Sequence, residues 1–265
     1  MIVTVDGVAL NVEEAGEGPP VVLLHGHALD LRVWDDVVPG LVGRGYRAIR
    51  YDQRGHGRSA SPRAGYGWGD HVADLVGLVE QLGASPAHLV GLSKGGGIVL
   101  ETALRRPDLV RSVAVVGPLV PGYPLSAELV ESFRVLARAI RADGPDVALR
   151  RHWLDHPLLA SSHALPGARE RLEAMVLTFP AGEYFAHRDS ETVAPAAASG
   201  LEAITAPTLV VAGERDVPDF RAMADAVAAG VPRARRADVA ASGHLVPLEQ
   251  PAALLALLLD FLAPR

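Results

Sequence analysis

Short apolar runs alternate with longer amphipathic stretches over the first 116 residues, and the alternation resumes after residue 207. The apolar runs predict strands, and they are Ile2–Val5, Val8–Glu14, Val21–Leu24, Tyr46–Tyr51, Leu89–Leu92, Val110–Val116 and Leu209–Ala212. Helical periodicity covers Leu31–Val42, Trp68–Leu82, Lys94–Arg106 and Ala252–Leu262. Strands that alternate with helices of this length predict an α/β fold with a mostly parallel sheet and helices on both faces.

The alternation stops near Pro118 and leaves residues 119–206 with a mainly helical pattern. We expect residues 1–118 and 207–265 to form the core and residues 119–206 to form a helical cap over the functional edge of the sheet. We call residues 119–206 the cap segment. A disordered linker is the alternative, but clustered aromatic residues and helical periodicity oppose it. These aromatic residues are Tyr123, Phe133, Trp153, Phe179, Tyr184 and Phe185.

Composition limits the classes of function. The 265 residues carry a net charge of −6 and are 49% hydrophobic, which is ample for a buried core. An acidic chain is not typical of a general nucleic-acid binder, whose surface would be basic, so we expect no nucleic-acid partner. The chain has no cysteine, which excludes disulfides, thiolate nucleophiles and cysteine-bound metals.

The first residues show no basic segment followed by an apolar one, so no secretory signal is visible and we expect a cytoplasmic protein. Residues 252–262 are apolar but too few to span a bilayer, and we expect no membrane partner. The oligomeric state stays open between a monomer and a homodimer.

The most informative motif is Gly91-Leu92-Ser93-Lys94-Gly95, which lies between a predicted strand and a predicted helix. In a nucleophile elbow the serine adopts a strained backbone conformation, and small neighbours are needed because side chains would collide. The motif alone occurs by chance about 0.1 times in such a chain. Its place between strand and helix therefore carries the prediction that Ser93 is a nucleophile.

A serine hydroxyl needs a base within hydrogen-bond reach, and the base needs a carboxylate that orients it. Asp216 follows the predicted strand Leu209–Ala212, and His244 is the only histidine after it. Ser93, Asp216 and His244 thus follow the nucleophile, acid, base order of α/β-hydrolases. Glu214 and Asp219 are the rival carboxylates.

A tetrahedral intermediate also needs two donors for its oxyanion. We expect one to be the backbone N–H of Lys94 at the start of a helix, where the helix dipole helps. The other is expected from His27, in the loop after Val21–Leu24. We expect a structural hydrogen bond from His25 and no role for it as a base.

No cofactor or metal site is predicted. The glycine-rich stretch Asp52–Ser59 fits neither a Walker loop nor a dinucleotide-binding loop, so we interpret it as a structural turn anchored by Asp52 and Arg54. The histidines of the cap segment, His152, His156, His163 and His187, have no metal-ligand spacing.

Five ordered motifs resemble those of the α/β-hydrolase superfamily over nearly the whole chain. They are His25-Gly26, Asp52–Ser59, Gly91–Gly95, Gly213–Asp216 and Ser242-Gly243-His244 with Glu249-Gln250-Pro251. The resemblance implies an eight-stranded sheet with an inserted helical cap. Within the superfamily the chain looks most similar to capped carboxylesterases and enol-lactonases, and Trp153–Leu158 is similar to a stretch of such esterases. Haloalkane dehalogenases and epoxide hydrolases use an aspartate nucleophile, whereas Ser93 stands here.

The resemblance implies hydrolysis of a small-molecule ester or lactone through an acyl-enzyme. The residues expected to shape its pocket are Trp34, Leu119, Tyr123, Trp153 and Leu245. Two alternatives stay open: a binding or signalling protein that turns over slowly or not at all, and a hydrolase of carbon–carbon bonds with the same triad.

Lys94 is the only lysine in the chain, against 24 arginines, and relatives usually carry an uncharged residue after the serine. The helix dipole disfavours a cation at this position, so a compensating group is expected. The ammonium either attracts a substrate that bears a carboxylate, or pairs with a protein carboxylate or solvent.

Overall fold

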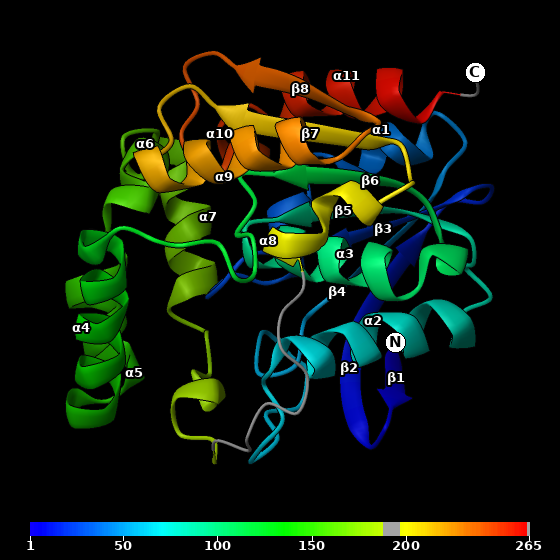
Figure 1. The fold of residues 1–265 in the computed structure, drawn as a ribbon. Helices are drawn as coiled ribbons and strands as arrows, with labels where there is room; N and C mark the ends of the chain where they lie inside the picture. The colour runs from blue at the N-terminus through cyan, green and yellow to red at the C-terminus, as the bar shows by residue number, and fades with distance from the viewer. Residues whose placement is uncertain (188–196, 264–265) are drawn as a thin grey trace.

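The protein is built on one twisted sheet, seen in a computed structural model that describes residues 1–187 and 197–263 (Figure 1). The strand order is β1-β2-β4-β3-β5-β6-β7-β8. The strands are β1 (Ile2–Val5), β2 (Val8–Ala15), β3 (Pro20–Leu24), β4 (Arg47–Tyr51), β5 (Ala87–Leu92), β6 (Val110–Val116), β7 (Thr208–Gly213) and β8 (Ala234–Val239). The predicted eight-stranded α/β architecture is confirmed.

The pairing follows the sequence pattern. The β1–β2 hairpin turns at Asp6 and Gly7, whose φ angles of 47° and 82° are both positive, as a tight two-residue hairpin turn requires. β2 pairs antiparallel with β4, and every later pairing is parallel. All residues of β5 and β7 are buried. Such continuous burial is typical of parallel strands covered on both faces.

β8 lacks the apolar run that marks the other strands, and the sequence pattern did not locate it. It is an edge strand, and its arginines lie half-buried and pair with carboxylates on the surface. Arg235 pairs with Asp260, and Arg236 pairs with Asp225 and Asp238. Charged edge strands also resist pairing with other chains.

The helices cover both faces of the sheet (Figure 1), with α2, α3 and α9 toward the viewer and α1 and α11 behind. The core helices are α1 (Val38–Val42), α2 (Trp68–Gln81), α3 (Lys94–Arg105), α9 (Pro218–Gly230), α10 (Val246–Glu249) and α11 (Pro251–Leu262). The helix expected over residues 31–42 is instead a 3-10 turn, η1 (Leu31–Trp34), followed by α1. Asp30 caps η1 through its side chain, and Pro39 starts a new helix because proline fits a first turn.

The described part of the cap segment is helical, and α4 to α7 stand at one end of the sheet (Figure 1). Its helices are α4 (Ala127–Asp143), α5 (Pro145–Ala148), α6 (Ala160–His163), α7 (Pro166–Val176) and α8 (Ala197–Gly200), with a 3-10 turn η5 (Gly182–Tyr184). Residues 188–196 of the predicted cap lie outside the described residues. Among the described helices, none has the length and apolar character needed to cross a membrane.

Candidate functional site

Ser93 occupies a strained turn between β5 and α3. Its φ of 53° and ψ of −116° lie outside the common regions for a residue with a side chain. A Cβ on Gly91 would come within 2.3 Å of the Gly95 carbonyl oxygen, and a Cβ on Gly95 would lie 2.6 Å from the Leu24 and His25 carbonyl oxygens. Both glycines are therefore required, because the backbone of α3 passes too close to its neighbours for any side chain.

Asp216 and His244 meet beside this turn. Asp216 follows β7, and its Oδ2 lies 2.9 Å from Nδ1 of His244, which precedes α10. The other oxygen, Oδ1, accepts a hydrogen bond from the Val217 N–H at 2.8 Å, and the ring of Phe220 lies 4.3 Å from the imidazole, edge on. Because Nδ1 contacts the carboxylate, Nε2 is the ring nitrogen of His244 that could transfer a proton.

The loop that carries His244 is held by Glu249. Its Oε2 accepts hydrogen bonds from the Gly243 N–H and the Ser242 hydroxyl, and its Oε1 accepts one from Ser162 in the cap segment at 2.5 Å. The imidazole position is therefore set by buried polar contacts on both sides of the loop.

Two residues near Ser93 offer backbone N–H groups as candidate oxyanion donors. Lys94 is the first residue of α3, and His27 lies in the loop after β3. In the part of the chain that the structure describes, neither the N–H of Lys94 nor that of His27 has a hydrogen-bond acceptor. Free backbone donors beside a strained serine are what an oxyanion requires.

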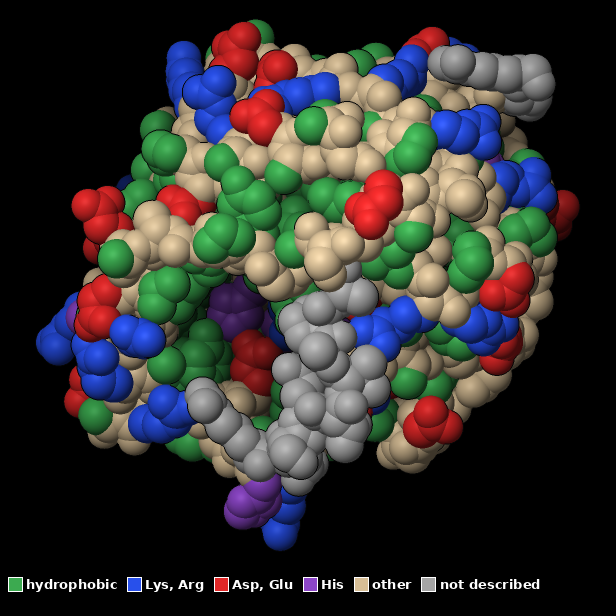
Figure 2. Space-filling view, in the orientation of Figure 1, with side chains coloured by type: hydrophobic (Ala, Val, Ile, Leu, Met, Phe, Trp, Pro, Cys, Tyr) green, Lys and Arg blue, Asp and Glu red, His purple; other side chains and the backbone are tan. Residues whose placement is uncertain are grey.

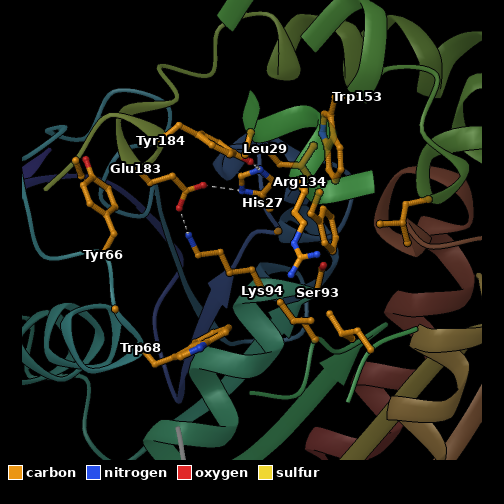
Figure 3. A pocket seen from close by; sticks show the side chains of 18 of the residues that line it. His27, Leu29, Tyr66, Trp68, Ser93, Lys94, Arg134, Trp153, Glu183 and Tyr184 are labelled. Atoms are coloured by element: carbon orange, nitrogen blue, oxygen red, sulfur yellow. Dashed lines mark hydrogen bonds and ion pairs between the residues drawn. The ribbon is translucent and has the colours of Figure 1, made fainter. Parts of the chain in front are cut away.

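The side chains of these two residues share one carboxylate (Figure 3). Glu183, in η5, lies 2.9 Å through Oε1 from His27 Nδ1 and 2.9 Å through Oε2 from Lys94 Nζ. Burial opposes the charge on Glu183, but Lys94 and His27 hold the pKa of its carboxyl well below its usual range. Of the two interpretations of the Lys94 charge, the structure therefore shows the one in which a protein carboxylate neutralises it.

Three buried histidines, His25, His56 and His71, belong to the same electrostatic environment. Burial, helped by the Lys94 charge, lowers the pKa of His56 and His71 well below the usual value, and burial also lowers that of His25. His25 accepts a hydrogen bond on Nε2 from the Gln53 N–H at 2.9 Å, the structural role predicted for it.

His27, His56 and Glu183 are also the described residues with a metal-ligand arrangement. One ligand atom from each lies within 4.8 Å of the others. The ammonium of Lys94 already occupies the carboxylate, however, and it repels a second cation there. Charge neutralisation within the protein explains the cluster without a metal.

The predicted turn anchors act separately. Asp52 accepts hydrogen bonds from the Leu31 and Arg58 N–H groups and from the Asn11 amide. Arg54 instead forms a buried bidentate pair with Asp74 of α2, at 2.6 and 2.7 Å. The glycine-rich stretch after β4 is thus fastened at two points, as a structural turn requires.

Ser93, Lys94 and His244 line a cavity of about 1760 Å³ between the sheet edge and the cap segment. Figure 2 shows the hollow, with histidine and acidic side chains at its floor and hydrophobic side chains around it. Three expected pocket residues line it: Leu119, Trp153 and Leu245.

The other two expected pocket residues, Trp34 and Tyr123, lie elsewhere in the structure. Trp34 is fully buried in η1, within the hydrophobic core, and Tyr123 is half-buried against the same core. Neither is among the described residues that line the cavity. An aromatic residue near a functional loop serves packing as readily as ligand contact, and the sequence does not distinguish the two.

Other lining residues were not singled out by the sequence. Glu183 is an isolated acidic residue in a short turn, Tyr66 lies in the loop before α2, and Arg134 lies on α4. For Glu183 a signal existed, because the lone lysine beside a helix start required a compensating carboxylate. Glu183 lies 89 residues after Lys94 in the chain, however, and no local sequence pattern connects the two residues.

Comparison with known proteins places this geometry in context. A sequence model of the α/β hydrolase fold family matches residues 19–251. Over 114 residues the chain is 38% identical to 2-(acetamidomethylene)succinate hydrolase from Mesorhizobium japonicum, which covers 43% of this chain and 41% of that protein. It is 40% identical over 127 residues to epoxide hydrolase A from Mycobacterium tuberculosis, covering 46% and 39%. The matches span less than half the length of these curated relatives.

A solved structure matches over almost the full length. A thermophilic esterase from Thermogutta terrifontis, with malate bound, superposes with a TM-score of 0.85 at 26% identity. The match covers 99% of this chain and 98% of the esterase.

Proposed function

We propose that this chain, which belongs to the α/β hydrolase fold family, is a serine hydrolase that cleaves a small-molecule carboxylic ester or lactone. Ser93 is the nucleophile, His244 the general base and acid, and Asp216 the residue that orients His244. The backbone N–H groups of His27 and Lys94 form the oxyanion hole.

One observation carries the proposal: a strained serine and the imidazole of a carboxylate–imidazole pair line one cavity, together with two residues whose backbone N–H groups have no acceptor among the described residues. Each part has a separate chemical task. The pair raises the nucleophilicity of the hydroxyl, and the donors stabilise the charge that develops on the carbonyl oxygen.

In the proposed reaction, Ser93 Oγ attacks the carbonyl carbon while His244 Nε2 takes the hydroxyl proton. The carbonyl oxygen becomes an anion that the two backbone N–H groups bind. The intermediate then collapses: the bond to the leaving oxygen breaks, and His244 returns the proton to that oxygen. A water molecule, deprotonated by His244, releases the acid and restores Ser93.

The cavity favours a substrate with an extended apolar part. Its volume of about 1760 Å³ exceeds the usual range of about 300–1,000 Å³ for small-molecule sites. Much of its wall is aliphatic or aromatic, including Leu119, Leu125, Phe133, Leu158 and Leu159. Epoxide opening by an aspartate nucleophile does not fit this elbow, because the position of the nucleophile holds Ser93 and not a carboxylate.

The test is steady-state hydrolysis of p-nitrophenyl butyrate and of a γ-lactone. Ser93→Ala is expected to lose at least about 10³-fold in kcat. The matched control is Ser112→Ala, a buried serine on β6 that contacts His88 outside the cavity, which should leave kcat unchanged. Turnover of Ser93→Ala near the wild-type rate would contradict the proposal. So would a wild-type protein that hydrolyses neither ester nor lactone but cleaves a vinylogous diketone, the type of substrate for a hydrolase of carbon–carbon bonds.

A further inference from the structure

Glu183 joins the cap segment to two separate parts of the core. Its carboxylate reaches His27, in the loop after β3, and Lys94, at the start of α3. The side chains of Glu183, His27 and Lys94 are only 16%, 18% and 11% exposed, so the interactions are shielded from water. Partly buried charge pairs of this kind hold their geometry better than surface pairs do.

The His27 ring is held by the cap segment on its other sides as well. Its Nε2 lies 2.8 Å from the Tyr184 hydroxyl, next to Glu183 in the chain. The rings of Trp153 and Phe179 contact it edge on, at centroid distances of 5.4 and 5.2 Å. A core residue therefore has its side chain embedded among cap residues, which ties the course of its loop to the position of the cap.

The turn that carries Glu183 is itself fixed. Arg141 of α4 donates a hydrogen bond from Nε to the Tyr184 carbonyl oxygen at 2.9 Å. Ala181 has a φ of 55°, a left-handed conformation that directs the chain into η5. The carboxylate is thus presented from a defined position.

We propose that Glu183 is a positioning residue that aligns the two oxyanion donors. Its carboxylate contacts the side chains of His27 and Lys94, and the backbone N–H groups of the same two residues bind the oxyanion. When the cap segment packs on the core, Glu183 therefore fixes the positions of both donors. The inference rests on the proposed function of the site. Each carboxylate oxygen already has a partner within the protein, His27 Nδ1 on Oε1 and Lys94 Nζ on Oε2.

The test uses Glu183→Gln, a nearly isosteric change that removes the charge. Losing one oxyanion donor outright costs about 10²–10³ in kcat, so misalignment should lower kcat by about 10-fold or more. KM should change by less than about threefold, because ground-state binding does not use the donors. The affinity of an alkyl boronic acid, whose tetrahedral adduct places an oxygen in the oxyanion hole, should fall by the same factor as kcat/KM.

Lys94→Met removes the other end of the bridge and provides a second variant if Glu183→Gln does not fold. It should show the same fall in kcat, whereas Lys94→Arg, which keeps the cation, should restore much of it. Circular dichroism and the midpoint of thermal unfolding verify that each variant is folded.

The matched control is Asp36→Asn, which breaks the ion pair between the core and Arg171 of α7 without touching His27 or Lys94. This exposed pair should change kcat by less than about twofold. Equal losses in Asp36→Asn and Glu183→Gln would overturn the proposal in favour of general cap anchoring. Wild-type kcat in Glu183→Gln, with Ser93→Ala inactive, would overturn it and leave the hydrolase function standing. Failure of the hydrolase function itself appears as activity that is independent of Ser93.

Discussion

Gly117 lies against the contact between Asp216 and His244, and adding one methyl group there tests the catalytic assignment. Its φ is +48°, and a Cβ would lie 3.1 Å from both Asp216 Oδ2 and His244 Nδ1. Ordinary contacts of a Cβ begin near 3.4 Å, so the pair must shift by a few tenths of an ångström. Gly117→Ala therefore perturbs the acid and the base together without removing either group.

Two effects should separate in this variant. A left-handed alanine costs about 1–2 kcal/mol of folding free energy. Since a misplacement of about 1 Å costs about 10²-fold in rate, a shift of about 0.3 Å should lower kcat by about fourfold. Gly83→Ala is the control, because Gly83 has a φ of +58° and nothing within 4 Å of its Cβ position.

The assay combines urea unfolding with hydrolysis of p-nitrophenyl butyrate. Both variants should lose similar stability, and only Gly117→Ala should lose kcat. If Gly117→Ala retains the kcat of Gly83→Ala, the pair beside Gly117 does not set the rate and the reasoning fails.

Three further predictions follow from the site and its surroundings. Because Glu183 neutralises Lys94, Lys94→Met should lower kcat/KM equally on neutral and anionic esters, and a selective loss on the anionic ester would contradict that pairing. In a p-nitrophenyl ester series from acetate to hexanoate, kcat/KM should rise by up to about fourfold per methylene buried in the apolar cavity, and a flat series would refute an acyl site there. Burial lowers the pKa of His88 to about 4, below the unfolded value, so its contribution to stability is complete above pH 6.5 and is lost as the pH falls toward 4. His88→Asn should therefore make the loss of stability with acid shallower by up to about 1.4 kcal/mol per pH unit, and an unchanged slope in urea unfolding would exclude the effect.

Local patterns predicted the central sheet because its strands are buried on both faces and its turns have distinctive chemistry. The Asp6-Gly7 hairpin and the Gly91–Gly95 elbow depend on backbone conformations that few residues adopt, and those residues are visible in sequence. β8 was missed for the opposite reason, since an edge strand with paired arginines has no apolar run.

The sequence predicted those site residues that belong to motifs in a recognisable order along the chain. Asp216 follows a predicted strand and His244 precedes the last predicted helix, and the structure brings them within hydrogen-bond distance. Glu183 comes from a turn whose position depends on how the cap segment packs, which no local pattern encodes. The sequence also does not show that Trp34 is buried in the core, because an aromatic residue that packs in the core and one that contacts a ligand look alike in sequence.

The central claim is that Ser93 is an activated nucleophile, and covalent labelling tests it most directly. A fluorophosphonate probe should modify the wild-type protein at one site per chain, with the adduct located on Ser93 by peptide mass spectrometry. Ser93→Ala should remain unlabelled, and Asp216→Asn should be labelled much more slowly. Labelling that persists in Ser93→Ala, or a folded wild-type protein that does not react, would contradict the account.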